Sequence, residues 1–313
     1  MSLAIIFNGQ GAHYEGMGLD FAKAYPIAEQ TFDQAEQITG YPLRKWLADD
    51  IAPLAQTQYA QVAIAATSLA IYHSIQAELP DISHMAGLSL GEYTSLIAGE
   101  MLGFEEGMKL IQKRGQLMTS HCETLREESD IVMEAVMKMP LDEVRTVLAE
   151  VNESVEKAFL ANINSSTQIT IAGTTEAVDE FKALAKERGY KRMMPLKVEG
   201  PFHTPYMAPV AKPFQEALEE VTFQEPTIPI ISNTTVQPHN VIDIRDWLTR
   251  HLTESVRWQE TMDHFMSKGV DKVIQIGPGK TLANLLKREA NAPEILVLDK
   301  IDDVEKLADF IGG

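Results

Sequence analysis

The feature that most constrains this chain is a serine between two glycines, written G-L-S-L-G over residues 87–91. It follows a short apolar run, residues 82–86, and precedes a segment of helical character, residues 90–98. A strand, a sharp turn and a helix in this order are the setting of a nucleophile elbow, because small neighbours permit the strained backbone of the serine. Ser89 is therefore the candidate nucleophile, although an ordinary glycine-lined turn has the same short pattern.

Composition and charge restrict the partners of the chain. Its 313 residues suit one large domain, or a large domain that carries a smaller one. The net charge of -18 argues against nucleic acid and an anionic membrane as partners. No window approaches the roughly 18 consecutive apolar residues of a membrane span, and residues 2–7 suit a first strand better than a signal peptide. The single cysteine, Cys122, favours a cytoplasmic location, and no metal-ligand spacing is present, so we expect no metal site.

Most of the chain alternates between strand and helix patterns, which predicts an α/β fold with a parallel sheet. We expect buried strands at residues 3–7, 82–86, 227–232 and 270–276. We expect helices at residues 26–38, 57–79, 90–98, 104–125, 205–220, 243–251 and 258–268.

A different pattern begins near residue 129. Strands are expected at 131–137, 158–163, 169–172 and 191–198, with a turn at 164–166 and helices at 141–151 and 175–187. The order βαββαβ is that of a ferredoxin-like unit. We therefore predict an α/β-hydrolase-like catalytic subdomain with a parallel sheet, residues 1–128 and 199–313, and an inserted ferredoxin-like subdomain, residues 129–198.

Three other features carry possible chemistry. The glycines of G-Q-G and G-M-G, residues 9–11 and 16–18, fit neither a dinucleotide fingerprint nor a phosphate loop. They could instead let backbone N–H groups approach a reacting centre. Arg114 lies in a helical segment and His203 at the junction before a helix. By sequence alone, an ion-paired arginine and a structural histidine remain the alternatives.

Taken together, these stretches resemble the malonyl-CoA:acyl carrier protein transacylases of fatty acid synthesis and the related acyltransferase domains of polyketide synthases. The resemblance covers nearly the whole chain and keeps the order of the motifs. These are G-Q-G with G-M-G, G-L-S-L-G-E-Y, Q-K-R-G-Q-L-M, A-N-I-N-S-S, G-P-F-H-T-P-Y-M, S-N-T, S-V-R-W and I-G-P-G-K-T-L.

The resemblance implies a role for each matching residue. Ser89 corresponds to the nucleophile and His203 to its general base. The backbone N–H groups of Gln10 and Leu90 correspond to the oxyanion hole. Arg114 corresponds to the arginine that binds the free carboxylate of the malonyl group, and a planar guanidinium suits a carboxylate because it can donate two parallel hydrogen bonds.

Further positions are expected to shape the substrate pocket. Phe202 resembles the bulky ring of malonyl-selective members, and Met118 and Asn162 lie within two of the shared motifs. Leu88 departs from the family because many members have histidine there, which predicts an altered pocket polarity. His251 stands where members often have a bracing glutamine, which puts the support of His203 in question. Residues 130–137 are poorer in small side chains than is usual in the family.

The implied function is transfer of a malonyl group from malonyl-CoA to the phosphopantetheine thiol of acyl carrier protein, through a malonyl-serine intermediate, for fatty acid synthesis. The alternatives are a trans-acting acyltransferase or acyl hydrolase of a polyketide synthase, or a non-catalytic docking subunit. We expect a monomer with no permanently bound cofactor. Carrier-protein docking is expected at one of two basic groups, although either could equally be solvated surface. They are Lys186, Arg188, Lys191 and Arg192, or Lys280, Lys287 and Arg288.

Overall fold

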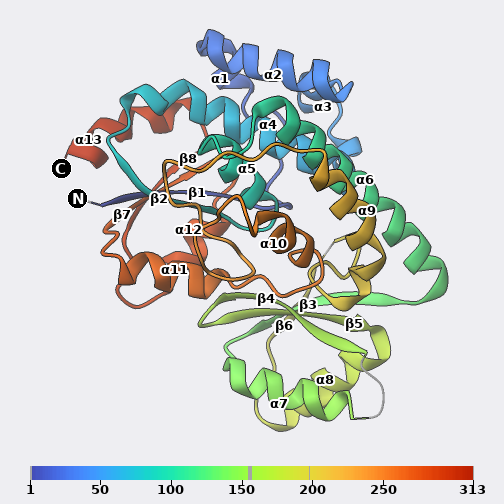
Figure 1. Cartoon of the computed structure of the whole chain (residues 1–313). Helices are drawn as coiled ribbons and strands as arrows, with labels where there is room; N and C mark the ends of the chain where they lie inside the picture. Colours follow the sequence, from blue (N-terminus) through green and yellow to red (C-terminus); the bar gives the residue numbers. More distant parts are fainter. Residues whose placement is uncertain (1, 154–156, 197, 313) are drawn as a thin grey trace.

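The larger part of the protein is built on a parallel sheet. The computed structural model describes residues 2–153, 157–196 and 198–312. Its sheet has the order β2-β1-β7-β8, with every neighbouring pair parallel. The strands are β1 (Leu3–Phe7), β2 (Ile82–Gly87), β7 (Lys272–Ile276) and β8 (Glu294–Leu298). Their apolar side chains are buried on both faces, as expected of parallel strands covered by helices (Figure 1).

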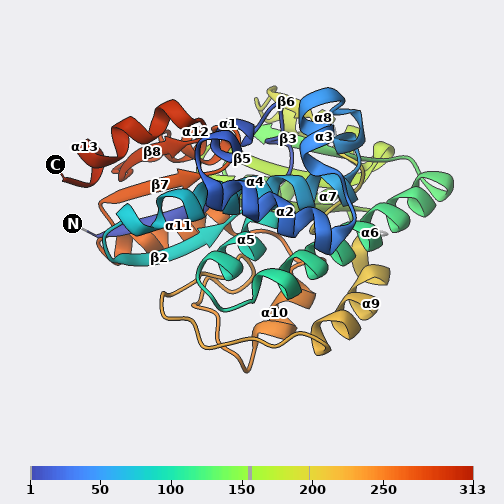
Figure 2. The ribbon, with the colours of Figure 1, turned by 90° about the horizontal axis from the view of Figure 1, so that it is seen from above.

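Helices pack on both sides of this sheet (Figures 1 and 2). The alanine-rich α4 (Thr57–Ile75) is almost completely buried, because it lies between α2 (Pro26–Thr39) and the sheet (Figure 1). The other helices of this part are α1 (Leu19–Ala24), α3 (Leu43–Asp49), α5 (Leu90–Ala98), α6 (Phe104–Glu128), α9 (Ala208–Glu219), α10 (Ile244–Arg250), α11 (Trp258–Ser267), α12 (Thr281–Leu286) and α13 (Leu307–Gly312). Short 3-10 turns span Ala52–Ala55, Gln76–Glu78, Pro205–Met207 and Ile301–Lys306.

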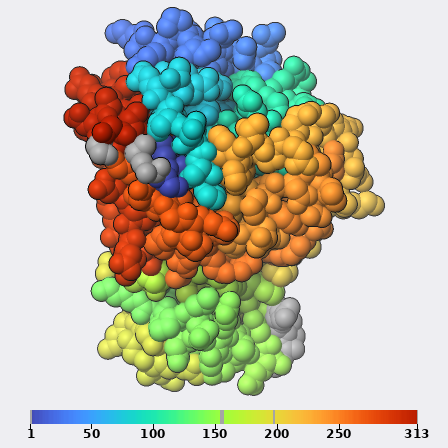
Figure 3. Space-filling model, turned by 60° about the vertical axis from the view of Figure 1, so that its left-hand side comes forward, coloured from blue at the N-terminus to red at the C-terminus, as the bar shows by residue number. Residues whose placement is uncertain are grey.

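The smaller part is an antiparallel sheet with two helices on one face, and it forms the lower end of the molecule (Figures 1 and 3). Its strands, in the order β4-β5-β3-β6, are β3 (Ile131–Met137), β4 (Ala158–Ser165), β5 (Gln168–Thr174) and β6 (Met193–Pro195). Helices α7 (Leu141–Val151) and α8 (Thr175–Glu187) pack on the sheet around a separate apolar core. A large α/β part with a small inserted subdomain is therefore confirmed, while the boundaries at residues 128/129 and 198/199 stay a prediction.

Several predicted elements are wrong in extent, and the prolines explain two of them. Residues 227–232 form no regular strand, only single bridges of Ile230 to Met85 and of Ile231 to Pro238. Pro229 has no N–H group to donate to a ladder. Strand β6 is shorter than the predicted 191–198 and ends at Pro195; residue 197 lies outside the described residues. The predicted turn at 164–166 lies at residues 166–167, and α1, α3, β8 and α13 were not predicted.

None of the helices within the described ranges combines the length and the apolar character that a bilayer crossing requires.

Candidate active site

Ser89 occupies the turn between β2 and α5, with a backbone φ of 53° and ψ of -102°. Both neighbouring glycines are sterically required. A Cβ on Gly87 would lie 2.0 Å from the carbonyl carbon of Gly91, and a Cβ on Gly91 would lie 2.2 Å from the carbonyl oxygen of Phe7. The turn can therefore be this tight only with glycine at both places, as the elbow pattern predicts.

Asn233 fixes the elbow from outside. Its Nδ2 donates to the carbonyl of Gly87 at 2.8 Å, and its Oδ1 accepts the N–H of Ser89 at 2.8 Å. The amide thus bridges the two residues around the sharpest point of the turn. The sequence reasoning gave Asn233 no role, although the motif S-N-T contains it.

His203 lies within hydrogen-bonding distance of the nucleophile. Its Nε2 is 2.7 Å from Ser89 Oγ, and its Nδ1 is 2.7 Å from the backbone carbonyl of His251. Only a protonated Nδ1 can donate to a carbonyl, so Nε2 is left to accept the serine proton. Burial, and then the nearby charge of Arg114, lower the pKa of His203 to about 3. The ring is therefore neutral at pH 7 and able to act as a base.

The base is held in a strained backbone of its own, with a φ of 62°. Asn233, which braces the nucleophile, lies in the loop after α9, and His251, which braces the base, lies at the end of α10. Because these residues are far from Ser89 and His203 in the sequence, local patterns cannot identify them. The support of His203 comes from the carbonyl of His251, and a carbonyl does not depend on the side-chain type at this position.

Arg114 is completely buried on α6 and points at the nucleophile. Its Nη2 donates to Ser89 Oγ at 3.2 Å and its Nη1 donates to Gln61 Oε1 at 2.8 Å. The guanidinium lies 5.0 Å from the centre of the Tyr93 ring. Its Nε has no hydrogen-bond partner among the described residues. Burial lowers the pKa of Arg114, and a guanidinium nevertheless keeps its proton.

Gln61 was not predicted, yet it connects two predicted residues. Its Oε1 accepts from Arg114 and its Nε2 donates to the sulfur of Met118 at 3.5 Å. Gln61 is buried on α4, in a run whose alanine-rich pattern indicated only scaffold. The structure therefore brings Met118 close to the arginine, and its contact with substrate stays a prediction.

The two predicted oxyanion donors lie just after a strand and at the start of a helix. Leu90 is the first residue of α5, where N–H groups have no partner inside the helix, and the N–H of Ser89 is already taken by Asn233. Gln10 follows β1, and its side chain donates to Thr57 Oγ1 at 2.9 Å. The N–H of Thr57 in turn donates to Glu199. The oxyanion roles of Gln10 and Leu90 stay predictions.

The remaining predicted pocket residues, Leu88, Phe202 and Asn162, lie in different packing environments. Leu88 packs with the apolar cluster on one face of the sheet, and a Cβ on Gly9 would lie 3.1 Å from its Cδ2. Phe202 is buried in the main core. Asn162 lies where β4 bridges to Val256. These positions suit packing, and their substrate contacts stay predictions.

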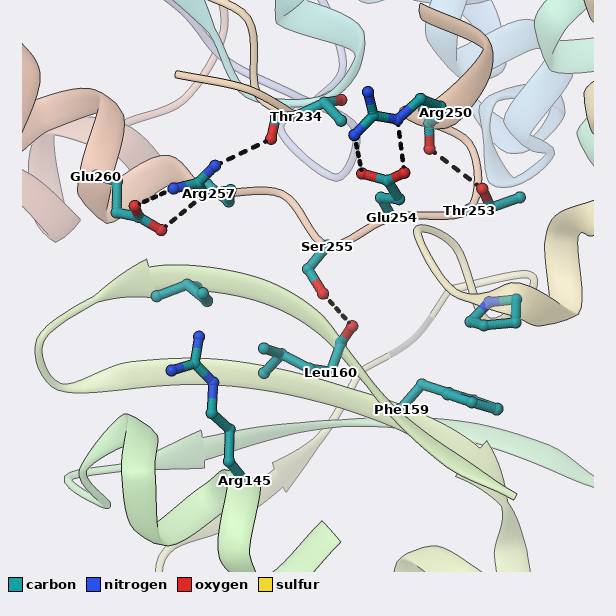
Figure 4. Close-up of a pocket in the computed structure, with 12 residues that line it drawn as sticks. Arg145, Phe159, Leu160, Thr234, Arg250, Thr253, Glu254, Ser255, Arg257 and Glu260 are labelled. Atoms are coloured by element: carbon teal, nitrogen blue, oxygen red, sulfur yellow. Dashed lines mark hydrogen bonds and ion pairs between the residues drawn. The ribbon is translucent and has the colours of Figure 1, made fainter. Parts of the chain in front are cut away.

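A cleft of about 630 Å³ lies between the two parts, beside the loop that precedes α11 (Figure 4). Two of its arginines are paired within it: Arg250 contacts Glu254 and Arg257 contacts Glu260 (Figure 4). The third, Arg145, lies 3.6 Å from Asp142 and is more than half exposed. The backbone N–H of Arg257 also donates to the carbonyl of Asn233 at 3.0 Å, so one wall of the cleft supports the residue that braces the elbow.

A nucleophile on a strained elbow, a neutral buried histidine and a buried arginine with unused donors are the parts of a serine acyltransferase. The acyl transferase domain model matches residues 4–306. A malonyl CoA-acyl carrier protein transacylase of Bacillus subtilis (strain 168) is 33% identical over 290 residues, which cover 91% of this chain and 90% of the relative. The chain belongs to this family of malonyl CoA-acyl carrier protein transacylases.

Solved structures agree over the full length. MCAT from Streptococcus pneumoniae has 37% identity and a TM-score of 0.92, covering 98% of this chain and 99% of that chain. A type II PKS acyl-carrier protein in complex with its malonyl-transacylase provides a second match, in which the matching chain has 31% identity, a TM-score of 0.92 and 100% coverage of both chains.

Proposed function

We propose that this protein transfers the malonyl group of malonyl-CoA to the phosphopantetheine thiol of acyl carrier protein, through a malonyl ester of Ser89. The observation that carries the malonyl specificity is the state of Arg114. A guanidinium has five N–H donors. Among the described residues, Gln61 and Ser89 each accept one of them, and the buried Nε has no partner. A buried cation with free donors beside a nucleophile suits an acyl group that ends in a carboxylate.

The first half of the reaction forms the acyl-enzyme. His203 Nε2 takes the proton of Ser89 Oγ while Oγ attacks the thioester carbonyl of malonyl-CoA. The N–H groups of Gln10 and Leu90 hold the tetrahedral oxyanion. The intermediate collapses by breaking its bond to sulfur, and the imidazolium gives its proton to the departing CoA thiolate.

The second half reverses these roles with a new thiol. His203 takes the proton of the phosphopantetheine thiol, and the sulfur attacks the ester carbonyl. The bond to Ser89 Oγ breaks, and the imidazolium returns its proton to the serine. No water takes part, so a hydrolase differs from this enzyme only in the acceptor that it admits.

One labelled substrate tests the proposal and separates its alternatives. Radiolabelled malonyl-CoA without carrier protein should release CoA and label the peptide that contains Ser89, and Ser89→Ala should abolish both. Addition of carrier protein should move the label to its phosphopantetheine arm. Free malonate as the main product would instead indicate an acyl hydrolase, and absence of label and product would indicate a docking subunit.

We further propose that carrier protein docks on the small part, at the edge formed by β6. Carrier proteins of this family are acidic, so an overall acidic enzyme needs a local basic face. Lys191 and Arg192 are exposed, and no carboxylate of the described residues pairs with their side chains. Apolar Met194 of β6 and Val198, which follows β6 in the chain, are also exposed, 52% and 42% respectively. Arg188 of the same predicted group is instead paired with Glu150 and Glu143.

Charge reversal tests this surface against the alternative basic group. Lys191→Glu with Arg192→Glu should raise the KM for carrier protein by roughly 3- to 10-fold and leave acylation by malonyl-CoA unchanged. Lys23→Glu with Lys45→Glu, at exposed sites on α1 and α3 at the opposite end of the molecule (Figure 1), is the matched control. An unchanged KM would transfer the proposal to Lys280, Lys287 and Arg288.

The setting of the reaction is part of the same proposal. We propose a monomer that works in the cytoplasm and supplies extender units for fatty acid synthesis. The buried free thiol of Cys122 supports a reducing compartment. Sedimentation of the purified chain would test the oligomeric state.

A further inference from the structure

A cluster of buried ionisable side chains lies directly behind the catalytic pair, and the mechanism above does not use it. Glu92, His239 and His251 all have side chains that are at most 1% exposed. Glu92 Oε1 is 2.6 Å from His239 Nε2, and Glu92 Oε2 is 3.2 Å from His251 Nδ1. Burial of a carboxylate is costly, so its presence here calls for a compensating role or partner.

Glu92 does not serve its own helix. It is the third residue of α5, where a glutamate often folds back to cap the N-terminus. Its carboxylate turns away instead, to a histidine of the loop before α10 and to the histidine that ends α10. Oε2 makes no formed hydrogen bond, since the geometry to His251 Nδ1 is unfavourable. One oxygen is thus anchored by His239, and the other lies 3.2 Å from His251 Nδ1.

His251 connects this carboxylate to the catalytic centre. Its ring stacks on the His203 ring with 4.9 Å between centroids and 28° between planes. Its other face stacks with Tyr93 at 6.2 Å. Burial, followed by the charges of His203, Arg114 and His239, lowers the pKa of His251 well below its usual value. The His251 ring is therefore neutral, and it contacts the Glu92 carboxylate through Nδ1 and the His203 ring by stacking.

The charges around the site indicate which positive charge the Glu92 carboxylate can offset. The charge of Glu92 raises the pKa of the Arg114 guanidinium, although burial lowers it more. Once a malonyl carboxylate pairs with Arg114, Glu92 is the buried anion left over. Both half-reactions place a positive charge on His203, whose own Nδ1 faces only a neutral carbonyl. A fixed negative charge behind the ring favours that imidazolium more than the neutral ring.

We infer that Glu92 is the buried counter-charge of the His203 imidazolium, acting through the stacked ring of His251, while His239 anchors its carboxylate. Glu92 is thus a positioning residue that touches no substrate, and the inference rests on the proposed acyl transfer. Because Glu92 also raises the pKa of Arg114, its effect on the base is isolated with acetyl-CoA, whose acyl group has no carboxylate to pair with Arg114.

The test is the rate of CoA release in the first turnover, measured by rapid quench on the full chain without carrier protein. Glu92→Gln keeps the shape and removes the charge. It should slow acylation by acetyl-CoA by roughly 10- to 100-fold with little change in KM. Glu134→Gln is the matched control, because Glu134 is a buried carboxylate of the small part, paired with Lys182. It should stay within about twofold of the wild type.

A double-mutant cycle tests the route through the stacked ring. His251→Gln should slow acylation, and Glu92→Gln combined with His251→Gln should be no slower than the slower single variant, because both remove one pathway. The inference would be overturned if the rate losses of the two single variants multiplied in the double variant. It would also be overturned by a wild-type acylation rate in Glu92→Gln, or by a loss that appears only in KM.

Two further results keep the outcome interpretable. If Glu92→Gln does not fold, His239→Gln releases one anchor and leaves the charge, and it should slow acylation by roughly 3- to 10-fold at unchanged KM. Wild-type speed in His239→Gln would then overturn the inference. A wild-type enzyme that forms no malonyl ester at Ser89 would defeat the proposed function instead.

Discussion

Replacement of Arg114 by methionine tests the core of the proposed specificity. Methionine keeps much of the buried volume of Arg114, but it removes the charge and every N–H donor. In the wild type, a malonyl carboxylate would meet a completely buried guanidinium whose Nε has no partner among the described residues. Breaking a buried charge pair by removal of one partner costs about 3–5 kcal/mol. That corresponds to a loss of roughly 200- to 5,000-fold in kcat/KM for malonyl-CoA.

The same substitution should spare acetyl transfer. An acetyl group has no carboxylate to pair with Arg114, so the guanidinium stays buried without a partner when acetyl-CoA binds. Removal of the guanidinium therefore removes this unfavourable contribution to acetyl binding. The expected result is a kcat/KM for acetyl-CoA within about twofold of the wild type or above it. The assay is CoA release from both substrates, with Lys113→Met, an exposed cation on the same helix, as the control. An equal loss for both substrates would refute the reasoning and would assign Arg114 to holding Ser89.

Three further predictions concern the base, the elbow and its neighbour. In the pH profile of kcat/KM for acetyl-CoA, Arg114→Met should move the loss of activity at acid pH to higher pH. The reason is that burial and the charge of Arg114 lower the pKa of His203 to about 3, and removal of the charge lets this pKa rise. Asn233→Ala should lower the free energy of unfolding in urea by about 2–4 kcal/mol, because it leaves the N–H of Ser89 and the carbonyl of Gly87 unpaired. Leu88→His should lower stability by about 1–3 kcal/mol and leave the malonyl to acetyl ratio within about threefold, since Leu88 packs in an apolar cluster.

The sequence predicted the elbow well because its determinants are local. Gly87 and Gly91 are required by contacts within one turn and with the adjacent strand, so the pattern G-x-S-x-G contains most of the information. The inserted part was equally local. Strand β3 and helices α7 and α8 have the predicted bounds, because each shows a clear hydrophobic period and a short connection.

The residues that support the nucleophile, the base and the arginine could not be predicted in the same way. Gln61, Asn233 and Glu92 act through side chains that meet residues 53, 144 and 147 positions away. Nothing in the periodicity of α4 distinguishes Gln61 from a helix-surface polar residue. The replacement at His251 raised doubt about the support of His203, but the structure assigns that support to the backbone carbonyl, which any residue supplies.

We propose that selectivity and rate depend on different charges, those of Arg114 and Glu92. In the empty enzyme, burial and Arg114 both weaken His203 as a base. A malonyl carboxylate that pairs with Arg114 cancels the second of these effects, so the correct substrate strengthens the base that will attack on its behalf. An acetyl group leaves Arg114 uncompensated and His203 weak, which penalises it in the chemical step as well as in binding. Glu92 lies 3.2 Å from His251 Nδ1, and the His251 ring stacks on the His203 ring. Variants of Arg114 should thus change the ratio of malonyl to acetyl transfer, and variants of Glu92 should lower the rate of both.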